Sequence, residues 1–435
     1  MNDFGHGNTK WFTADRFGMF IHWGLYAMAA RHEWVQNNEE IAEEDYRKYF
    51  ELFEPDLFDP KSWAVAAKNA GMKYVVITAK HHEGFCLFDS QYTEFKATNT
   101  KCGKDLLREV LEAFRGEGLR VGVYYSLLDW HHKDFVIDNR IGPYRNLSES
   151  ERSAMNQGRD MKKYAEYMRN QVTELLTNYG RIDVIWFDFS YPCAEAPEDA
   201  TRGKGHLQWE SEKMIRLVRQ LQPEIIVSNR LDLPGAGDIA TPEQYTPTQI
   251  PRDEAGTPIT WEGCQTFSGS WGYHRDESSW KSAGQCIRLL IDHVSRNGNL
   301  LMNVGPTARG FLDERALARL DDYAKWMKYH QKSIYNCAAA EGFQAPADCR
   351  YTLNSNTKRL YLHIYAWPFV RLQLAGLADK IKYAQFLHDG SEIKWIVVQK
   401  SNNSMSESTP DGAITLLLPV IKPNVEVPVV EFFLK

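Results

Sequence analysis

The sequence predicts an α/β fold: an irregular (β/α)8-like TIM barrel at residues 1–336, followed by an antiparallel β-sandwich at residues 337–435. Two observations support this prediction. In the first part of the chain, short apolar runs alternate with longer segments of helical periodicity, which is typical of repeated strand–helix units. After residue 337, apolar and polar residues alternate one by one, which is typical of strands with one face in a core.

Six runs in the first part predict strands that are buried on both faces, because they are almost continuously apolar. These are residues 17–23, 73–79, 120–126, 182–188, 224–229 and 299–305. Helices are expected between them, at residues 60–71, 105–118, 151–179 and 211–221. Six strands are fewer than the eight of a regular barrel, so we expect an irregular one. An open doubly wound sheet is the alternative, but no GxGxxG motif follows the first strand.

The C-terminal part reads as a small antiparallel β domain. The stretch RYTLNSNTKRLYLHIYAWP (350–368) alternates apolar and polar residues, and HDGS (388–391) and SNNS (401–404) are typical of turns. Clusters of residues with catalytic chemistry are few in this part. We therefore expect the functional site in the barrel.

The composition indicates a globular protein whose main partner is neither nucleic acid nor a membrane. The 435 residues are 43% hydrophobic and 25% charged, with a formal net charge of −6. The N-terminus shows no signal-peptide pattern, and no apolar run is long enough to span a bilayer. Seven scattered cysteines without a CxxC pair indicate reduced thiols. We therefore expect a cytoplasmic location.

Aromatic residues are abundant, with 13 Trp, 21 Tyr and 21 Phe. Aromatic rings fill cores, and they also form the walls of sugar-binding clefts, so composition alone leaves both interpretations open. The ends of the predicted strands are more informative. His22, His81-His82, Asp188 and Arg230 follow four of them. In a (β/α) barrel these ends meet at the face that carries the active site, so their convergence predicts a site there.

A metal site is the first interpretation of this convergence to test. His81-His82 and His131-His132 are adjacent pairs, and neighbours on a strand point to opposite faces, which disfavours chelation of one ion. The sequence has no HExxH motif and no carboxylate-rich loop. We therefore expect neither a metal nor another cofactor. Sugar hydroxyl groups are the other natural partners of imidazole and guanidinium groups at a neutral cleft.

Glycosidases need two carboxyl groups that flank the scissile bond, about 5–5.5 Å apart in the retaining class. Asp188, at the end of the apolar strand IDVIWFD, is the candidate nucleophile. Its structural alternatives are a helix N-cap or an ion pair with Arg230. The second carboxyl group must come from another loop, and the candidates are Glu33, Glu243 and Glu262.

Six motifs in their order along the chain resemble glycoside hydrolase family 29, the α-L-fucosidases. They are FGMFIHWG, HEW, YVVITAKHHEGF, GVYYSLLDW, DVIWFDFS and WEGCQTFSGSWGY, between Trp11 and about residue 310. The resemblance implies an exo-acting retaining enzyme that releases terminal α-L-fucose from an oligosaccharide or glycoconjugate. Asp188 matches the family's nucleophile, which forms a covalent fucosyl-enzyme intermediate. A homo-oligomer in which a neighbouring subunit supplies a site residue is compatible with this resemblance.

The resemblance also implies roles for the residues around the sugar. Trp271, in SWGY, is expected to pack on the C5 methyl group. The positions that match residues holding the fucose hydroxyl groups and ring are His22, Glu33, Trp34, His81, His82, Tyr125 and Arg230.

The chain departs from the family pattern in one place and leaves a choice open in another. The family often has glycine after the nucleophile, whereas this chain has Phe189. The acid/base sits on variable loops in the family. Glu243 matches the position used in some members and is favoured here, while Glu262 matches the position proposed in others and has a structural role as its alternative.

Two other functions remain open at this point. A retaining glycosidase for a related sugar such as galactose or arabinose would need a polar group where Trp271 is expected to pack. A non-catalytic fucose-binding protein would bind the sugar without turnover, and the presence of Asp188 with candidate acids disfavours it.

Overall fold

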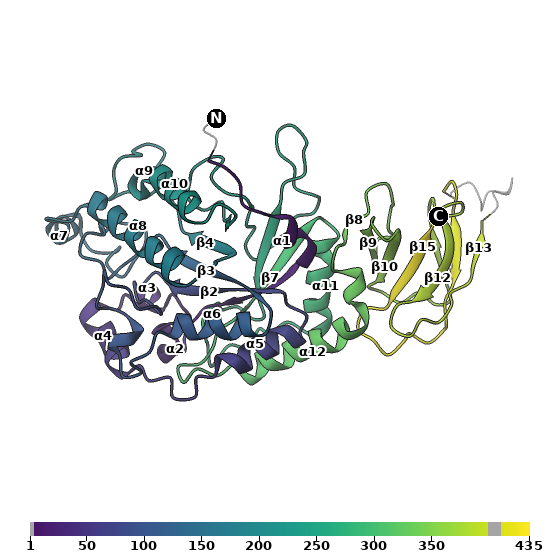
Figure 1. Cartoon of the computed structure of the whole chain (residues 1–435), viewed down its shortest axis with the longest axis horizontal. Helices are drawn as coiled ribbons and strands as arrows, with labels where there is room; N and C mark the ends of the chain where they lie inside the picture. Colours follow the sequence, from purple (N-terminus) through teal and green to yellow (C-terminus); the bar gives the residue numbers. More distant parts are fainter. Residues whose placement is uncertain (1–3, 399–409) are drawn as a thin grey trace.

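The computed structural model describes residues 4–398 and 410–435, and it confirms the predicted barrel followed by antiparallel β-sheets (Figure 1). Within these residues, seven parallel strands form one curled sheet in the order β5-β4-β3-β2-β1-β7-β6. The strands are β1 (Phe17–Ile21), β2 (Tyr74–Lys80), β3 (Arg120–Ser126), β4 (Val184–Asp188), β5 (Ile226–Val227), β6 (Trp261–Thr266) and β7 (Gly298–Val304).

An irregular segment, residues 239–243, fills the gap between the two edge strands of this sheet. Isolated parallel bridges pair Ile239 with Ser228 after β5, and Ala240 and Glu243 with Trp261 and Cys264 of β6. Backbone hydrogen bonds run from Asp238 N to Val227 O (2.8 Å) and from Glu262 N to Ala240 O (2.9 Å). The segment takes the place of an eighth strand, which explains why the sequence shows too few strand patterns for a regular barrel.

The helices surround this sheet, and their starts follow the sequence signals. At α5, for example, Asp59 accepts hydrogen bonds from Lys61 N and Ser62 N, and Pro60 occupies the first turn, where its missing N–H is no loss. The helices of the barrel part are α1 (Lys10–Asp15), α2 (Tyr26–Ala29), α3 (Val35–Asn38), α4 (Glu43–Leu52), α5 (Pro60–Asn69), α6 (Leu106–Gly116), α7 (Glu149–Met155), α8 (Met161–Asn178), α9 (His206–Trp209), α10 (Ser211–Leu221), α11 (Ala283–Val294) and α12 (Glu314–His330), with 3-10 turns at Ala97–Asn99 and Gln331–Ser333.

The single helix predicted at 151–179 is wrong. The chain forms α7 and α8 instead, with a break at residues 156–160. Gly158 lies in this break with φ +81°, a conformation that glycine adopts readily and that interrupts a helix. Within the described residues, no helix is long and apolar enough to cross a bilayer.

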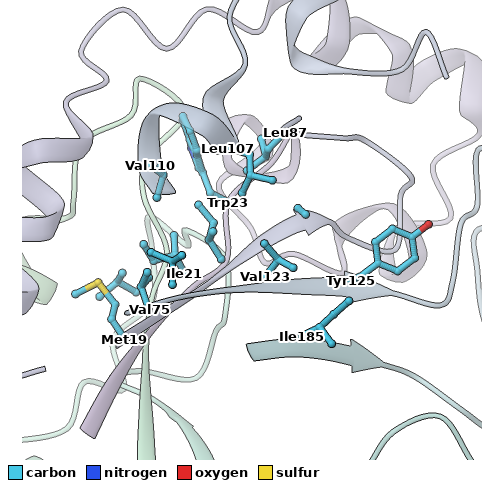
Figure 2. Close-up of a cluster of buried hydrophobic side chains, with 14 of the residues drawn as sticks. Met19, Ile21, Trp23, Val75, Leu87, Leu107, Val110, Val123, Tyr125 and Ile185 are labelled. Atoms are coloured by element: carbon cyan, nitrogen blue, oxygen red, sulfur yellow. The ribbon is translucent and has the colours of Figure 1, made fainter. Parts of the chain in front are cut away.

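Alternate residues of each barrel strand face opposite layers of core. Met19, Val75, Val123, Tyr125 and Ile185 face outward and belong to the main hydrophobic cluster, which also contains Leu107 and Val110 of α6 (Figure 2). The inward-facing residues form a second cluster inside the barrel, which includes Phe20, Tyr74, Val76, Tyr124, Val184, Trp186, Cys264 and Leu301. This alternation decides which side chains can reach a site inside the barrel.

A buried ion pair ties the end of strand β2 to the loop that follows strand β3. Lys80, the last residue of β2, donates to Asp129 Oδ2 (3.2 Å) and to Tyr164 Oη (3.2 Å). Asp129 Oδ1 in turn accepts from the backbone N–H groups of His131 and His132. Both charged side chains are fully buried. Their pairing therefore fixes the loop after β3 against the end of β2.

The C-terminal part consists of two antiparallel sheets around their own core of aliphatic and aromatic residues. The strands are β8 (Ala338–Ala339), β9 (Cys349–Asn354), β10 (Arg359–Ile364), β11 (Arg371–Leu374), β12 (Ile381–Phe386), β13 (Trp395–Val397), β14 (Ile414–Leu417) and β15 (Val429–Leu434). The predicted turn at 388–391 is confirmed, with Gly390 N bonded to Phe386 O. The turn predicted at 401–404 lies outside the described residues.

Helices α11 and α12 join these sheets to the barrel (Figure 1). Trp326 of α12 donates to Val427 O (3.0 Å), and Arg350 of β9 donates to Asp292 Oδ1 of α11 (2.8 Å). Val427 and Val429 also belong to the main hydrophobic core of the barrel part. The junction therefore combines apolar packing with an ion pair.

The Lys80–Asp129 pair yields a test of the fold. Replacing Lys80 by Met leaves the Asp129 carboxylate buried without its cation, so the free energy of unfolding should fall by about 3 kcal/mol or more. Urea unfolding measures the change. The control is Arg216→Met, which removes an exposed ion pair with Glu212 and should change the free energy of unfolding by less than about 1 kcal/mol. Equal losses in the two variants would contradict the importance of the buried pair.

Candidate active site

A small pocket of about 70 Å³ opens at the carboxyl ends of the barrel strands. Its wall combines aromatic rings, imidazoles and three carboxyl groups. They come from the ends of strands β1, β2, β3, β4 and β6, from the irregular segment 239–243 and from two loops. The lining residues are Phe20, His22, Glu33, Trp34, His81, His82, Tyr124, Trp186, Asp188, Phe189, Glu243, Cys264 and Trp271. The structure thus brings together most of the residues that the sequence singled out.

Asp188 is the last residue of β4, where it pairs with Ser126 of β3. Its Oδ2 accepts a hydrogen bond from Tyr124 Oη (2.7 Å), and its Oδ1 accepts one from Arg230 Nη1 (2.9 Å). The side chain is 13% exposed. The N-cap alternative is wrong, because the next helix begins only at His206, while the ion pair with Arg230 is present. One rigid strand and two donors therefore aim this carboxylate into the pocket.

Glu243 lies at the rim of the same pocket, at the end of the irregular segment that closes the barrel. Its Oε2 accepts a hydrogen bond from Arg230 Nη2 (2.9 Å), and its side chain is 41% exposed. Arg230 also donates from Nε to Thr241 Oγ1 (3.0 Å) and from Nη2 to Thr241 O (3.1 Å). One guanidinium group therefore holds the two carboxylates side by side, with Asp188 deep and Glu243 near solvent.

Burial and neighbouring charges shift the pKa values of three groups around Asp188, namely Glu243, Arg230 and Tyr124. Partial burial raises the pKa of Glu243, and the Asp188 charge adds to this, while Arg230 opposes it. The pKa of Arg230 is raised because the Asp188 and Glu243 charges outweigh its burial. Burial and the Asp188 charge hold the pKa of Tyr124 well above its usual value, so Tyr124 stays a neutral donor. A carboxyl group with a raised pKa thus stands beside a nucleophile candidate that accepts hydrogen bonds from two donors.

Two neutral imidazoles offer complementary hydrogen-bonding groups to a ligand. Burial lowers the pKa of His22 and of His82 well below the usual value. Nδ1 of His22 contacts Asn303 Oδ1 (2.7 Å), which can only accept, so the proton sits on Nδ1 and Nε2 is an acceptor. Nδ1 of His82 contacts Ser126 Oγ (2.7 Å), and Oγ also accepts from Leu128 N. Because the Ser126 hydroxyl is fully buried, its proton needs an acceptor, and within the described residues Nδ1 of His82 is the one in reach. Nε2 of His82 is then a donor.

Glu33 connects two loops at the mouth of the pocket. Its Oε2 accepts hydrogen bonds from the backbone N–H groups of Trp271 (3.1 Å) and Gly272 (2.8 Å). Trp271 packs on His22, with ring centroids 5.2 Å apart, and on Phe20. The Glu33 carboxylate therefore fixes the loop that carries Trp271, in addition to lining the pocket itself. Trp34, next in sequence, forms part of the opposite wall with Phe189.

The prediction for Tyr125 needs correction, because its neighbour Tyr124 faces the pocket. Tyr125 points out of the barrel (Figure 2), and its hydroxyl donates to Gln171 Oε1 of α8 (2.7 Å). Consecutive strand residues point to opposite faces, so only one of the two tyrosines can reach the site. The register of the sheet decides between them: Ser126 pairs with Asp188, so Tyr124, two residues before Ser126, lies on the same face of the sheet as Asp188.

Glu262 is not available as an acid/base, so this candidate is corrected too. The segment WEGCQT, taken from the sequence as a loop, is strand β6, and Glu262 points into the barrel with 0% exposure. It accepts hydrogen bonds from Tyr74 Oη and from Trp186 Nε1 (3.2 Å), and it does not line the pocket. Burial raises its pKa to about 7.

The expectation that adjacent histidines face opposite sides is wrong for His81 and His82. Strand β2 ends at Lys80, so both rings lie beyond it and both line the pocket, with centroids 4.0 Å apart. Across residues 4–398 and 410–435, no group of three or more His, Cys, Asp or Glu side chains is arranged to hold a metal ion. The sequence analysis also missed Asn303, one of two asparagines in strand β7, whose amide donates to Trp271 O (2.6 Å).

Phe189 adopts a backbone conformation that is unusual for a bulky residue, with φ +81°. Such a conformation costs about 1–3 kcal/mol and persists only where the surroundings enforce it. The ring packs against Trp34 and His82, with centroids 5.2 Å apart in both cases, and lines the pocket. The left-handed φ explains why glycine suits this position in the family, and the ring narrows the pocket on the Trp34 side.

A barrel with a guanidinium-bridged carboxylate pair at its strand ends, beside neutral imidazoles and aromatic walls, has the architecture of a glycoside hydrolase. Comparison with known proteins defines the family. The profile of the family described as alpha-L-fucosidase matches residues 5–332. The chain belongs to the α-L-fucosidase family, glycoside hydrolase family 29, and the resemblance seen in the sequence is confirmed.

Similar proteins cover almost the whole chain. Plasma α-L-fucosidase of Homo sapiens is 28% identical over an aligned length of 425 residues, and the alignment covers 90% of this chain and 84% of that protein. The structure of α-L-fucosidase isoenzyme 1 from Paenibacillus thiaminolyticus is 42% identical with a TM-score of 0.89, and 98% of each chain is covered. A family 29 structure from Bacteroides thetaiotaomicron, described as a trapped covalent intermediate with 2-fluoro-fucosyl fluoride, is 28% identical with a TM-score of 0.81 and 99% coverage of both chains.

The raised pKa of Glu262 gives a test of its burial. Its folded-state pKa of about 7 exceeds the ordinary value of 4.5, so the folded protein binds this proton more tightly than the unfolded chain does. This contribution to stability is complete below pH 4.5 and is lost as the pH rises through about 7. Relative to Glu262→Gln, the free energy of unfolding of the wild type should fall by about 3 kcal/mol over this window. Urea unfolding at several pH values measures it, and a constant difference would contradict the assignment.

Proposed function

We propose that the protein is an exo-acting, retaining α-L-fucosidase that releases terminal α-L-fucose from an oligosaccharide or glycoconjugate, with Asp188 as nucleophile and Glu243 as acid/base. The observation that carries this proposal is the bridge of Arg230 to both carboxylates. A shared guanidinium limits the separation of the two carboxyl groups. A short separation suits direct attack by one carboxylate, whereas an inverting enzyme needs room for a water, about 6.5–9.5 Å.

The reaction follows from the different environments of the two carboxyl groups. In the first step a carboxylate oxygen of Asp188 attacks the anomeric carbon, and Glu243 donates its proton to the glycosidic oxygen as that bond breaks. In the second step Glu243 takes a proton from water, the water oxygen attacks the anomeric carbon, and Asp188 leaves as a carboxylate. The raised pKa of Glu243 supports the first role, and the greater exposure of Glu243 supports access of the leaving group and of water.

The walls of the pocket support a neutral deoxy sugar as substrate. Each sugar hydroxyl can donate and accept, which matches the acceptor Nε2 of His22 and the donor Nε2 of His82. Trp271 offers an apolar surface for a methyl group, whereas the hydroxymethyl group of galactose would lose hydrogen bonds to water there. The small volume and the buried floor formed by Phe20 and Trp186 support exo action on a single terminal ring.

The nucleophile is tested with Asp188→Ala on an aryl α-L-fucoside. Removing the attacking carboxylate should lower kcat by more than about a hundredfold, because covalent catalysis contributes several powers of ten. The matched control is Asp232→Ala, which removes a carboxylate two residues after Arg230 that contacts His206 and should leave kcat within about twofold. An Asp188→Ala variant that retains more than about a hundredth of wild-type kcat would show that the nucleophile lies elsewhere.

The acid/base is tested by comparing Glu243→Ala with Glu262→Ala in the presence and absence of azide. With Glu243 removed, the fucosyl-enzyme forms from a substrate with a good leaving group, and azide should then attack it from the face that the leaving group occupied, to give α-fucosyl azide. Product analysis by NMR identifies the anomer. Rescue of Glu262→Ala instead of Glu243→Ala would reverse the assignment, and rescue of neither variant would require an acid from outside this pair.

A further inference from the structure

The Glu262 carboxylate lies beneath the pocket rather than in it, yet it belongs to a chain of contacts that ends at Asp188. Its Oε1 accepts the indole N–H of Trp186 (3.2 Å), and its Oε2 accepts the hydroxyl of Tyr74. Asn299 donates to the Tyr74 hydroxyl from the neighbouring strand β7 (3.3 Å). Both carboxylate oxygens are therefore occupied by donors from two strands, and the rotation of the Trp186 ring is fixed from below.

Trp186 in turn supports both groups that donate hydrogen bonds to Asp188. The guanidinium carbon of Arg230 lies over the indole ring, 4.8 Å from its centroid. The ring of Tyr124 stacks on the same indole, with centroids 6.0 Å apart and planes inclined by 19°. Arg230 and Tyr124 are the two donors to Asp188, at 2.9 and 2.7 Å. The indole thus sets the position of the proposed nucleophile's complete pair of side-chain donors.

The structure assigns Glu262 a role as a positioning residue for the proposed reaction: by holding the indole N–H of Trp186, it places Arg230 and Tyr124 against Asp188. This inference rests on the proposed function of Asp188. Glu262 itself touches neither the substrate nor a reacting atom, because it is fully buried and absent from the pocket wall.

Two physical effects act through this contact. The first is geometric, since a tryptophan whose N–H is bonded inside the barrel cannot rotate, and the surface on which Arg230 lies stays fixed. The second is electronic, since an acceptor oxygen on the indole N–H increases the electron density of the ring and strengthens its attraction for the guanidinium above it. The free energy of a desolvated cation–π contact corresponds to about a three- to thirtyfold change in an equilibrium constant. We expect the loss of kcat to fall in this range.

The experiment compares variants that break the Glu262–Trp186 contact with one that leaves it intact. Glu262→Ala removes the acceptor, Trp186→Phe removes the donor and keeps an aromatic ring, and Tyr74→Phe removes only the other hydrogen bond of Glu262. Each variant is assayed with a nitrophenyl and a dinitrophenyl fucoside, and its thermal midpoint is recorded. Glu262→Gln serves as the conservative variant, because its amide oxygen can still accept the indole N–H.

We expect Glu262→Ala to lower kcat about tenfold on both substrates, with little change in KM, since the broken contact lies behind the nucleophile. Trp186→Phe should lower kcat at least as much, because it also changes the floor of the pocket. Tyr74→Phe should lower the thermal midpoint and leave kcat within about twofold. Glu262→Gln should recover most of the kcat lost in Glu262→Ala. The double variant Glu262→Ala/Trp186→Phe should be no slower than Trp186→Phe alone, because the two residues act through one contact.

Several results would overturn the inference. The first is an unchanged kcat in Trp186→Phe or in folded Glu262→Ala. The second is a loss of kcat in Tyr74→Phe as large as that in Glu262→Ala. The third is a loss in the double variant that equals the product of the two single losses. Azide rescue of Glu262→Ala, or a loss confined to the poorer leaving group, would make Glu262 the acid/base instead. If Glu262→Ala does not fold, Trp186→Phe decides alone. Failure of the proposed function is separate, because the wild type would then release no fucose.

Discussion

The guanidinium group of Arg230 is the contact on which the rest of the site depends. Two carboxylates that share a partly buried pocket repel each other, and a cation between them offsets that repulsion. Arg230 does this with one nitrogen for each carboxylate, and its raised pKa keeps it charged. Its third contact, to Thr241, ties the guanidinium to the segment that carries Glu243. Loss of this residue would therefore disturb both carboxyl groups together.

The irregular closure of the barrel explains how two carboxyl groups with different tasks arise from one sheet. Asp188 ends a regular strand, which holds it rigidly and deep. Glu243 ends the irregular segment 239–243, which hydrogen-bonds to its neighbours on both sides while its last side chain remains near solvent. A regular eighth strand would have placed a residue here as deep as Asp188. The departure from a regular barrel thus places the proposed acid/base near solvent, beside the more deeply buried proposed nucleophile.

The apolar pattern of the sequence was enough to predict strands that consist mostly of apolar residues. It was not enough where polar residues lie in the core. Strands β1 to β4 and β7 are almost wholly apolar, so their patterns predicted them well. Strand β6 was missed because it carries Glu262 and Gln265, and a buried glutamate becomes acceptable only through partners far away in sequence, Tyr74 and Trp186. For the same reason the sequence did not predict that the backbone N–H of Trp271 donates to the Glu33 carboxylate, which lies 238 residues away in the sequence.

The errors at single residues have equally local causes. Tyr124 and Tyr125 differ only in which face of β3 they occupy, and the register between β3 and β4, which the apolar pattern does not give, decides between them. His81 and His82 share the pocket because β2 ends one residue earlier than the pair. The boundary of a strand is set by its tertiary partners, here the buried Lys80–Asp129 pair, and the apolar pattern alone does not locate it.

The central claim, that Asp188 attacks the sugar, is tested most directly by trapping. The protein is incubated with 2-fluoro-fucosyl fluoride, and the intact mass and the peptide masses are measured. A covalent intermediate predicts one added 2-fluoro-fucosyl group per chain, on the peptide that contains Asp188, and no adduct in Asp188→Ala. An unmodified wild-type protein that still turns over fucosides, or an adduct on a different residue, would contradict the account.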